Sequence, residues 1–419
     1  MSGEKIFVAT LENQNTILAN QAEIMAELKG QKPKRYGYRV KMSESNPSTR
    51  VEYIFDAKGF TPASMNFSTG AFNYGSWADL WFIRDNYPCM VTYDGVVDYR
   101  LDPNNYALRE ATGAASDVAN SAYAGNAMSA IPLCWVKRYT EGDYYYVIFC
   151  ETQYDEGYKA YAHTKPDGSI ASHAYHGIFE GAIVDGKLRS ISGLAPGSST
   201  TANAEENAAV ANSAVAKWHI RTWALNELIY DLLTLIGKST NLQATFGQGH
   251  STGGASAADF LATGTLNEMG QFFGCSTTTS AVKVFHIENF YAERWERVLG
   301  MIYKNGNYLV RMTEETGEYN FTGEGYESVC EGVPGASASG GYWKTSLQTE
   351  YGKFPKTLGG SETTYESDYH YYNNAIVSVP VVGGYCSYGG LCGRCVDVAA
   401  AAGAAGWSIG ASLSLLLPS

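Results

Sequence analysis

The carboxy-terminal part of the chain combines two glycine-lined apolar segments with an unpatterned stretch between them. The first segment ends in the pair Gly383 and Gly384, and the second runs from Trp407 to Leu413. Between them, residues 385–397 follow neither a helical nor a strand period, and an Ala/Gly run comes next. Apolar segments lined by glycine pack closely and are typical of the rigid framework of a domain. The stretch between them is therefore free to form a presented surface, where proteins commonly bind partners.

The composition narrows the choice of partner. The chain has 419 residues, enough for a large core and for two or three domains. Its aromatic fraction is 13%, with 31 tyrosines. Tyrosine suits binding surfaces because it offers a large contact area at a low cost in side-chain entropy, but it also fills β-strands. The net charge of −12, without a cluster of Lys and Arg, argues against a nucleic-acid partner.

The eight cysteines are scattered along the chain, at positions 89, 134, 150, 275, 330, 386, 392 and 395. The first residues are not followed by the apolar run of a secretory signal peptide, so we expect folding in a reducing cytoplasm with most thiols buried and free. Cys392 and Cys395 are half of a zinc motif that Cys386 and a distant His370 could complete, but a second such pair is missing. We expect no metal and no cofactor.

An uncharged run over residues 398–417 is long enough to cross a bilayer. Ala, Gly and Ser make up most of it, and strongly apolar residues gather only between Leu413 and Leu417. We therefore expect a buried strand over residues 408–416 rather than a membrane anchor, and no membrane insertion.

The amino-terminal residues 7–28 lack Gly and Pro and carry a heptad pattern. Leu11, Leu18, Met25 and Leu28 occupy apolar heptad positions, with glutamines at others. This pattern predicts a helix of about three heptads that oligomerises the chain. The alternative is one amphipathic helix that packs on its own domain. Residues 29–33 break the helix and have the composition of a linker.

From Tyr36 onward the pattern is that of a β-rich protein. Strands are predicted over residues 36–42, 50–56, 78–83, 89–93, 96–100, 133–138, 144–150, 158–163, 177–184 and 188–193, with tight hairpin turns at Asp94-Gly95 and Asp185-Gly186. Helices are predicted over residues 204–217 and 223–236, and Gly237 is expected to stop the second. The chain is therefore expected to be an α+β protein in which β-structure dominates.

Several segments, taken in order, carry a family resemblance: residues 214–218, 222–236, 286–290, Trp295 with Glu296, the 303–310 hairpin, Gly383-Gly384 and 407–413. Together they resemble the C-type-lectin-fold proteins of the formylglycine-generating-enzyme-like group, especially those of bacteriophages. The resemblance implies a C-type-lectin-like domain with two core helices over residues 131–419. A β-rich region over residues 31–130 and the helix of residues 1–30 would precede it. Part of the family has Arg where this chain has Ser412.

In this group the segment between the paired glycines and the terminal strand builds the ligand-facing surface. The resemblance therefore implies that the ligand-binding residues are Tyr385, Ser387, Tyr388, Leu391, Arg394 and Asp397. It also implies a non-enzymatic phage virion protein, of the tail-fibre or head-fibre type, that binds a host-surface protein or glycan. We expect synthesis in the host cytoplasm, location in the virion, contact with other virion proteins through the amino terminus, and a homotrimer.

An enzymatic alternative rests on the same resemblance. The formylglycine-generating branch binds copper through two cysteines that follow a Gly-Gly pair, and Cys386 with Cys392 is similar to that arrangement. Their spacing is one residue longer than the pattern of that branch. The basic and aromatic residues that follow the second cysteine in the branch are also missing here.

Other catalytic patterns are weaker. His173 and His176 lack a third metal ligand and are expected in a solvated loop. Glu288, Glu293 and Glu296 could be the paired carboxylates of a glycosidase. Glu288 is instead expected to brace a turn, and the other two to face water. Calcium is not expected, since the chain lacks a loop with clustered oxygen ligands.

Overall fold

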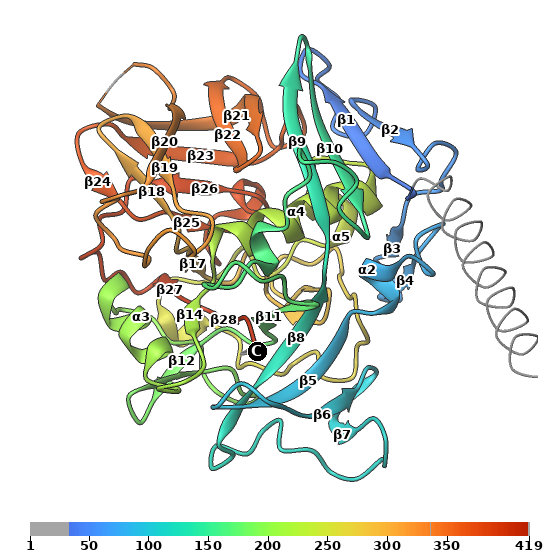
Figure 1. Ribbon diagram of the computed structural model, residues 1–419, viewed down its shortest axis with the longest axis vertical. Helices are drawn as coiled ribbons and strands as arrows, with labels where there is room; N and C mark the ends of the chain where they lie inside the picture. Colours follow the sequence, from blue (N-terminus) through green and yellow to red (C-terminus); the bar gives the residue numbers. More distant parts are fainter. Residues whose placement is uncertain (1–32, 336, 418–419) are drawn as a thin grey trace, which may run out of the picture.

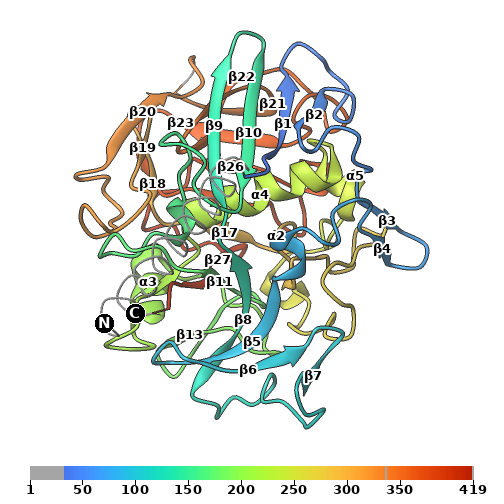
Figure 2. The same cartoon turned by 45° about the vertical axis from the view of Figure 1, so that its right-hand side comes forward.

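The computed structural model describes residues 33–335 and 337–417, and it confirms an α+β fold in which strands dominate (Figure 1). The expected oligomerisation residues, Leu11, Leu18, Met25 and Leu28, lie outside the described residues. Two seven-stranded and two four-stranded sheets form most of the molecule. Helix α4 (Trp223–Gly237) runs through the middle of the molecule, as Figures 1 and 2 both show.

Sheet 1 is antiparallel, with the strand order β2-β1-β10-β9. Tyr36 pairs with both Phe55 and Phe149, which sets the register of three strands. Tyr38 and Val40 alternate with more polar residues and are fully buried, as the period of two requires of a sheet with one core face. The strands are β1 (Tyr36–Lys41), β2 (Val51–Phe55), β9 (Trp135–Glu141) and β10 (Tyr144–Cys150).

Sheet 2 joins segments from both ends of the described chain, in the order β14-β28-β11-β8-β5-β6-β7. Strand β28 lies between β11 and β14 and pairs with both. The strands are β5 (Tyr87–Thr92), β6 (Val97–Asp102), β7 (Asn105–Arg109), β8 (Gly125–Pro132), β11 (His173–Gly177), β14 (Trp218–Ile220) and β28 (Leu413–Leu415).

The expected boundary at residue 130 lies inside β8. The largest core cluster joins Tyr38 and Val51 from before this point to Val147, Leu232 and Phe290 from after it. Residues 33–130 therefore share a core with the rest of the described chain. Residues 116–129 are rich in Ala, Asn, Ser and Gly, as loops between domains often are, yet residues 125–129 belong to the buried strand β8.

Sheets 3 and 4 come from the carboxy-terminal part of the chain. Sheet 3 has the order β22-β21-β23-β26-β25-β17-β27, with β17 (Trp295–Arg297), β21 (Ala338–Thr349), β22 (Gly352–Leu358), β23 (Tyr369–Asn373), β25 (Val381–Val382), β26 (Val396–Val398) and β27 (Ile409–Gly410). Sheet 4 has the order β20-β19-β18-β24, with β18 (Met301–Lys304), β19 (Asn307–Val310), β20 (Glu327–Glu331) and β24 (Val377–Ser378).

The remaining described elements are short. Three two-stranded hairpins are formed by β3 (Ser64–Asn66) with β4 (Ala71–Asn73), β12 (Ala182–Val184) with β13 (Lys187–Arg189), and β15 (Lys283–Val284) with β16 (Ile287–Glu288). The other helices are α2 (Trp81–Arg84), α3 (Ala202–Val210), α5 (Leu242–Phe246) and the 3₁₀ turns η1 (Tyr161–His163), η2 (Ala257–Asp259) and η3 (Gly389–Leu391).

Helix α4 begins where the Thr222 side chain accepts a hydrogen bond from the Leu225 amide, a regular amino-terminal cap. It extends one residue past its predicted end, and Lys238 closes it in the left-handed conformation, with φ of 49°. Residues 223–236 are all buried, including Glu227 and Asp231. A helix that is buried all round must find partners inside the molecule for its charged side chains.

Three predicted elements differ from the structure. Residues 78–83 were expected to form a strand, but helix α2 buries Trp81, Phe82 and Ile83 together, which the alternating faces of a strand could not do. Residues 158–163 form only a bridge at Lys159 and the turn η1. The helix predicted over residues 204–217 forms as α3 and ends at Val210. Just after this end, the side-chain amide of the buried Asn212 donates to the Ala209 carbonyl at 2.9 Å.

Arg394 supplies the charge that α4 needs. Its guanidinium lies 2.6 Å from the Glu227 carboxylate and 2.7 Å from that of Asp231, with only 3% of its side chain exposed. Arg138 of β9 lies 2.7 Å from the other oxygen of Asp231, and Tyr38 of β1 donates to the same carboxylate at 3.2 Å. The two arginines outweigh burial and hold the pKa of Asp231 below its usual value.

Replacing Arg394 by Met should lower the free energy of unfolding by about 3–5 kcal/mol, because the buried Glu227 would lose its ion-pair partner and the buried Asp231 would keep only Arg138. Urea denaturation measures this change. Arg39→Met is the matched control, since the pair of Arg39 with Glu52 is 35% and 40% exposed and should contribute less than about 1 kcal/mol. Equal losses in the two variants would contradict the central role of Arg394.

Candidate functional site

The paired glycines form the turn that brings the carboxy-terminal loop onto sheet 3. Gly383 and Gly384 have φ of 92° and 83°, a region that disfavours other residues. A Cβ at Gly384 would lie 2.5 Å from the sulfur of Cys392. The Gly383 amide donates to the Cys395 carbonyl at 3.0 Å, and the Gly383 carbonyl accepts from Gly393 at 3.2 Å. Both glycines are therefore required by the path of the backbone.

The loop that follows is held at its outer end by residues 251–254. Gly254 donates to the Cys386 carbonyl at 2.8 Å, and Gly389 donates to the Ser251 carbonyl at 2.7 Å. The Ser387 hydroxyl donates to the Gly254 carbonyl. Two of these three bonds join backbone atoms, so they hold the loop without using the rings of Tyr385 and Tyr388.

The predicted ligand-binding residues do not all lie on one surface. Ser387 is exposed, and Tyr385, Tyr388, Leu391 and Asp397 are partly exposed. Arg394, also expected to contact a ligand, is instead only 2% exposed and points into the core toward α4. The prediction for Arg394 is corrected for a physical reason: the carboxylates of a fully buried helix hold this cation in the interior.

The side chains of β23 and β26 alternate between an inner, buried face of sheet 3 and an outer face. They run parallel, with Tyr371 beside Asp397 and His370 beside Val396. Successive side chains of a strand point to opposite faces. His370 and Val396 are accordingly buried, whereas Tyr369, Tyr371 and Asp397 are partly exposed on the outer face.

Aromatic rings continue from this face across the loop. Neighbouring centroids along the row are 4.2 to 5.7 Å apart, and all the rings are partly exposed. Trp295, 3% exposed, supports the row from below, with its centroid 5.4 Å from that of Tyr388. We call this row the tyrosine surface, and its members are Tyr342, Tyr369, Tyr371, Tyr385, Tyr388 and Trp407.

Sequence reasoning found two rings of the tyrosine surface, Tyr385 and Tyr388, and treated Trp407 only as an anchor. It missed Tyr342, Tyr369 and Tyr371, which lie on strands outside the carboxy-terminal loop. The alternating aromatic residues at the start of β23 were an available signal. Nothing in the sequence, however, indicated that β23 would pair with β26.

Asp397 lies at the edge of the tyrosine surface. Its carboxylate accepts from the Ala399 amide at 2.6 Å. Burial raises the pKa of Asp397 to about 6, although the Ala399 amide opposes the shift. The negative charge of Asp397 in turn adds to the burial that raises the pKa of Tyr371 and Tyr388. The register of sheet 3 places this carboxylate beside Tyr371, whose ring centroid lies 5.7 Å from that of Tyr388.

The cysteines agree with the expectation of free, mostly buried thiols: all eight are free and six are buried. In the described part of the chain, no three or more His, Cys, Asp and Glu side chains form a metal-binding group. His370 in particular bonds to the Val396 carbonyl at 2.9 Å and to the Tyr308 hydroxyl at 3.2 Å, on the face of β23 opposite to Tyr371. Cys392 and Cys395 therefore cannot recruit it as a zinc ligand.

The copper alternative requires thiolates at Cys386 and Cys392. Burial, reinforced by the nearby Glu293, raises the pKa of Cys386 to about 12. Burial also raises the pKa of Cys392, whose thiol donates to the Tyr385 carbonyl at 3.5 Å. A metal at this pair would therefore have to displace two thiol protons, one of them near the Glu293 carboxylate.

The remaining candidate catalytic residues are structural. His173 and His176 lie on strand β11 rather than in a loop, and His176 is fully buried. Glu288 accepts from the amides of residues 264–266 and so braces a turn, as expected. Glu293 and Glu296 were expected to face water but are fully buried, because His250 and Arg294 pair with them at 2.6 and 2.7 Å.

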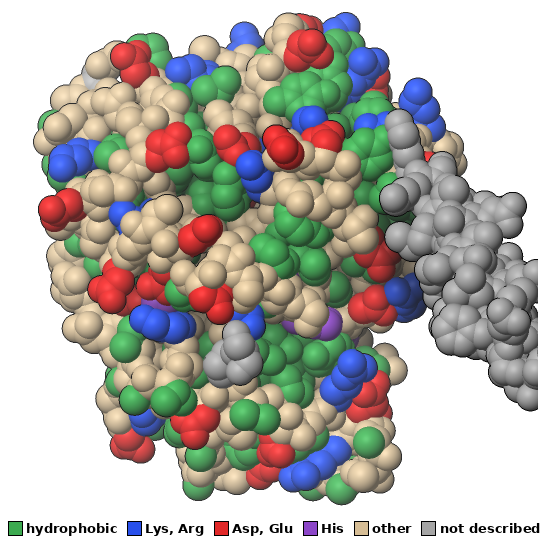
Figure 3. Space-filling model, in the orientation of Figure 1, with side chains coloured by type: hydrophobic (Ala, Val, Ile, Leu, Met, Phe, Trp, Pro, Cys, Tyr) green, Lys and Arg blue, Asp and Glu red, His purple; other side chains and the backbone are tan. Residues whose placement is uncertain are grey.

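On the face shown in Figure 3, Lys and Arg are interspersed with Asp and Glu and form no basic stripe. Within residues 33–335 and 337–417, no helix combines the length and the apolar character needed to cross a bilayer. The expected strand over residues 408–416 forms as two short strands, β27 and β28, in different sheets.

No protein-family model matches the sequence, and no curated protein matches it significantly.

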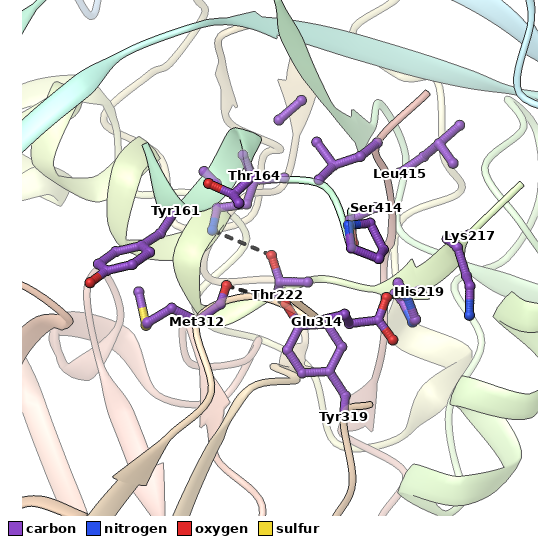
Figure 4. A pocket seen from close by; sticks show the side chains of 15 residues that line it. Tyr161, Thr164, Lys217, His219, Thr222, Met312, Glu314, Tyr319, Ser414 and Leu415 are labelled. Carbon is purple, nitrogen blue, oxygen red and sulfur yellow. Dashed lines mark hydrogen bonds and ion pairs between the residues drawn. The ribbon is translucent and has the colours of Figure 1, made fainter. Parts of the chain in front are cut away.

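A narrow pocket beside β28 is lined by both polar and apolar side chains (Figure 4). Lys217 and His219 lie on one side of the pocket, and Tyr161 and Met312 on the other. The cavity of about 40 Å³ has room for a few water molecules but not for a metabolite. His219 lies 2.6 Å from Glu206 of α3 and 3.0 Å from Glu314, so it joins two segments rather than a ligand.

Stability should depend on the charge of His219. Burial alone would lower the pKa of His219, but hydrogen bonds to Glu206 and Glu314 raise it from 6.5 to about 9. Protonated His219 should contribute at most about 3 kcal/mol to the free energy of unfolding. This contribution is complete below pH 6.5 and is lost as the pH rises through 9. Urea denaturation of wild type and His219→Gln should show a large difference at pH 6 that shrinks by pH 10. A constant difference would contradict this interpretation.

Proposed function

We propose that the chain is a phage virion protein, of the tail-fibre or head-fibre type, that binds a host-surface receptor through a C-type-lectin-like carboxy-terminal region. The observation that carries the proposal is the tyrosine surface, a continuous row of partly exposed rings on a fixed loop and sheet. The order of sequence segments that resemble phage lectin-fold proteins supports it. The role is adhesion rather than catalysis.

The framework below the rings is suited to binding. Two glycines fix the loop at one end, and Arg394 fixes the segment before β26 to helix α4. A surface held in place before binding loses little conformational entropy when a partner docks. Tyrosine and tryptophan add large contact areas with few rotatable bonds, a combination typical of paratopes.

We propose further that several copies act together. A shallow surface of this size gives weak single contacts, and linked copies convert later contacts into intramolecular ones, so avidity sets the strength of attachment. The heptad pattern of residues 1–30 would supply a trimer and the contact with other virion proteins.

The first test replaces both Tyr385 and Tyr388 by Ala. Binding of the purified protein to a panel of intact bacterial cells, followed by flow cytometry, should fall at least about tenfold, because aromatic anchors near the centre of an interface dominate its energy. Tyr144→Ala, on β10 and outside the tyrosine surface, is the matched control and should bind as wild type does.

A melting temperature close to that of wild type should accompany the loss of binding. Unchanged adhesion of the double variant, to cells that wild type binds, would refute the proposed function. A large drop in melting temperature would instead identify the two rings as core residues.

The second test removes residues 1–30. Light scattering should give a trimer for the full chain and a monomer for the truncated one, since the apolar heptad positions Leu11, Leu18, Met25 and Leu28 are lost together. The truncated protein should also lose avidity for cells. An unchanged mass would assign oligomerisation to another part of the chain.

A further inference from the structure

Elsewhere in the molecule, partly exposed rings are covered by the chain's own cations. Arginine guanidinium groups lie 3.8 to 4.4 Å from ring centroids, which is close enough for a favourable cation–π contact. The pairs are Arg35 with Phe55 and Tyr154, Arg39 with Tyr144, Arg100 with Tyr87, and Arg109 with Tyr99.

The tyrosine surface differs in this respect. The cation–ring contacts found in residues 33–335 and 337–417 lie at other rings, and none of them involves the six rings of the surface. The sequence explains why. Between residues 357 and 419 the one Lys or Arg is Arg394, whose guanidinium is buried against α4, and the one His, His370, is buried on the inner face of β23.

Two carboxylates lie beside these uncovered rings. Asp397 adjoins Tyr371 in the register of sheet 3, and it has no ion pair among those of the described residues. Glu362 is exposed and so close to Gly390 that a Cβ there would meet its carboxylate. Burial raises the pKa of Tyr342 to about 12, and the charge of Glu362 adds to the shift.

Building on the proposed function, we infer that the receptor is a protein segment presenting an arginine or lysine side chain, whose cation lies over Tyr371 and Tyr388 and pairs with Asp397. The electron-rich ring faces and the partly buried carboxylate both favour a positive charge at this point. Arginine suits it best, because a planar guanidinium can stack on a ring and bond to a carboxylate at once.

The same charges disfavour other receptors. Phosphate- or sulfate-bearing polymers would meet Asp397 and Glu362 on a chain with a net charge of −12. A neutral glycan could stack on the rings and donate hydroxyl hydrogen bonds to Asp397, but it would bring no positive charge to offset further burial of the carboxylate, which costs binding energy. A cationic side chain removes that cost.

Two blocked peptides test the inference on the full-length protein: one carries two arginines, and the other carries two citrullines, neutral analogues of the same shape. Isothermal titration calorimetry should give a dissociation constant on the order of 0.1–1 mM for the arginine peptide and at least about tenfold weaker binding for the citrulline peptide. Equal affinities would overturn the inference.

Variants of the surface separate the charge from the packing. Tyr388→Leu keeps apolar volume but removes the ring face, and it should weaken the arginine peptide at least about fivefold, whereas Tyr388→Phe should bind as wild type does. Asp397→Asn should weaken the arginine peptide and leave the citrulline peptide unaffected, with Tyr144→Leu as the control. If Tyr388→Leu or Asp397→Asn binds as wild type does, the inference is wrong.

Competition on cells distinguishes this inference from the proposed function. The arginine peptide should displace the protein from cells that it binds. Displacement by a neutral oligosaccharide but not by the arginine peptide would refute the cationic receptor and leave adhesion through this surface intact. If wild type binds the arginine peptide but the Tyr385→Ala/Tyr388→Ala variant adheres normally to cells, the proposed function is refuted and the cation site is kept.

Discussion

The ion pairs of Arg394 with Glu227 and Asp231 are the interaction on which the rest of the structure depends. Helix α4 is buried on every side, so its two carboxylates must be neutralised inside the molecule. One cation comes from sheet 1, through Arg138, and the other from the segment before β26. Sheet 1, α4 and the carboxy-terminal loop are thereby joined through charge as well as through apolar packing. The cost of separating these charges holds the three parts in one arrangement.

The position of Arg394 also determines what the outside of sheet 3 can carry. The one Lys or Arg of residues 357–419 is used internally, so no cation of this segment lies over the row of rings or pairs with the two carboxylates beside it. The alternation of β23 completes this division, since it puts His370 and Tyr372 into the core and Tyr369 and Tyr371 outside. The alternation of side chains along β23 thus supplies both buried core residues and rings of the tyrosine surface.

Sequence reasoning succeeded where a pattern is local. The hairpins at Asp94-Gly95 and Asp185-Gly186 form as predicted, and α4 ends within one or two residues of its expected end, because turn residues and apolar periods act over short distances. It failed where partners are remote. Nothing near Arg394 in the chain reveals its two carboxylate partners, which lie 163 and 167 residues earlier in the sequence. The parallel pairing that brings Tyr371 beside the loop spans only 26 residues, from Tyr371 to Asp397, but no local turn signal announces it.

The division of residues 409–415 between two sheets has a consequence for how the protein is made. Strand β28 is the common neighbour of β11 and β14, and β27 completes the edge of sheet 3 beside β17. During synthesis, β11 and β14 therefore wait with open hydrogen-bonding edges until almost the whole described chain has left the ribosome. Such edges invite wrong pairing between nascent molecules. Sheet 2 can therefore close only after β28 has been made, and such long-range strand pairing folds slowly.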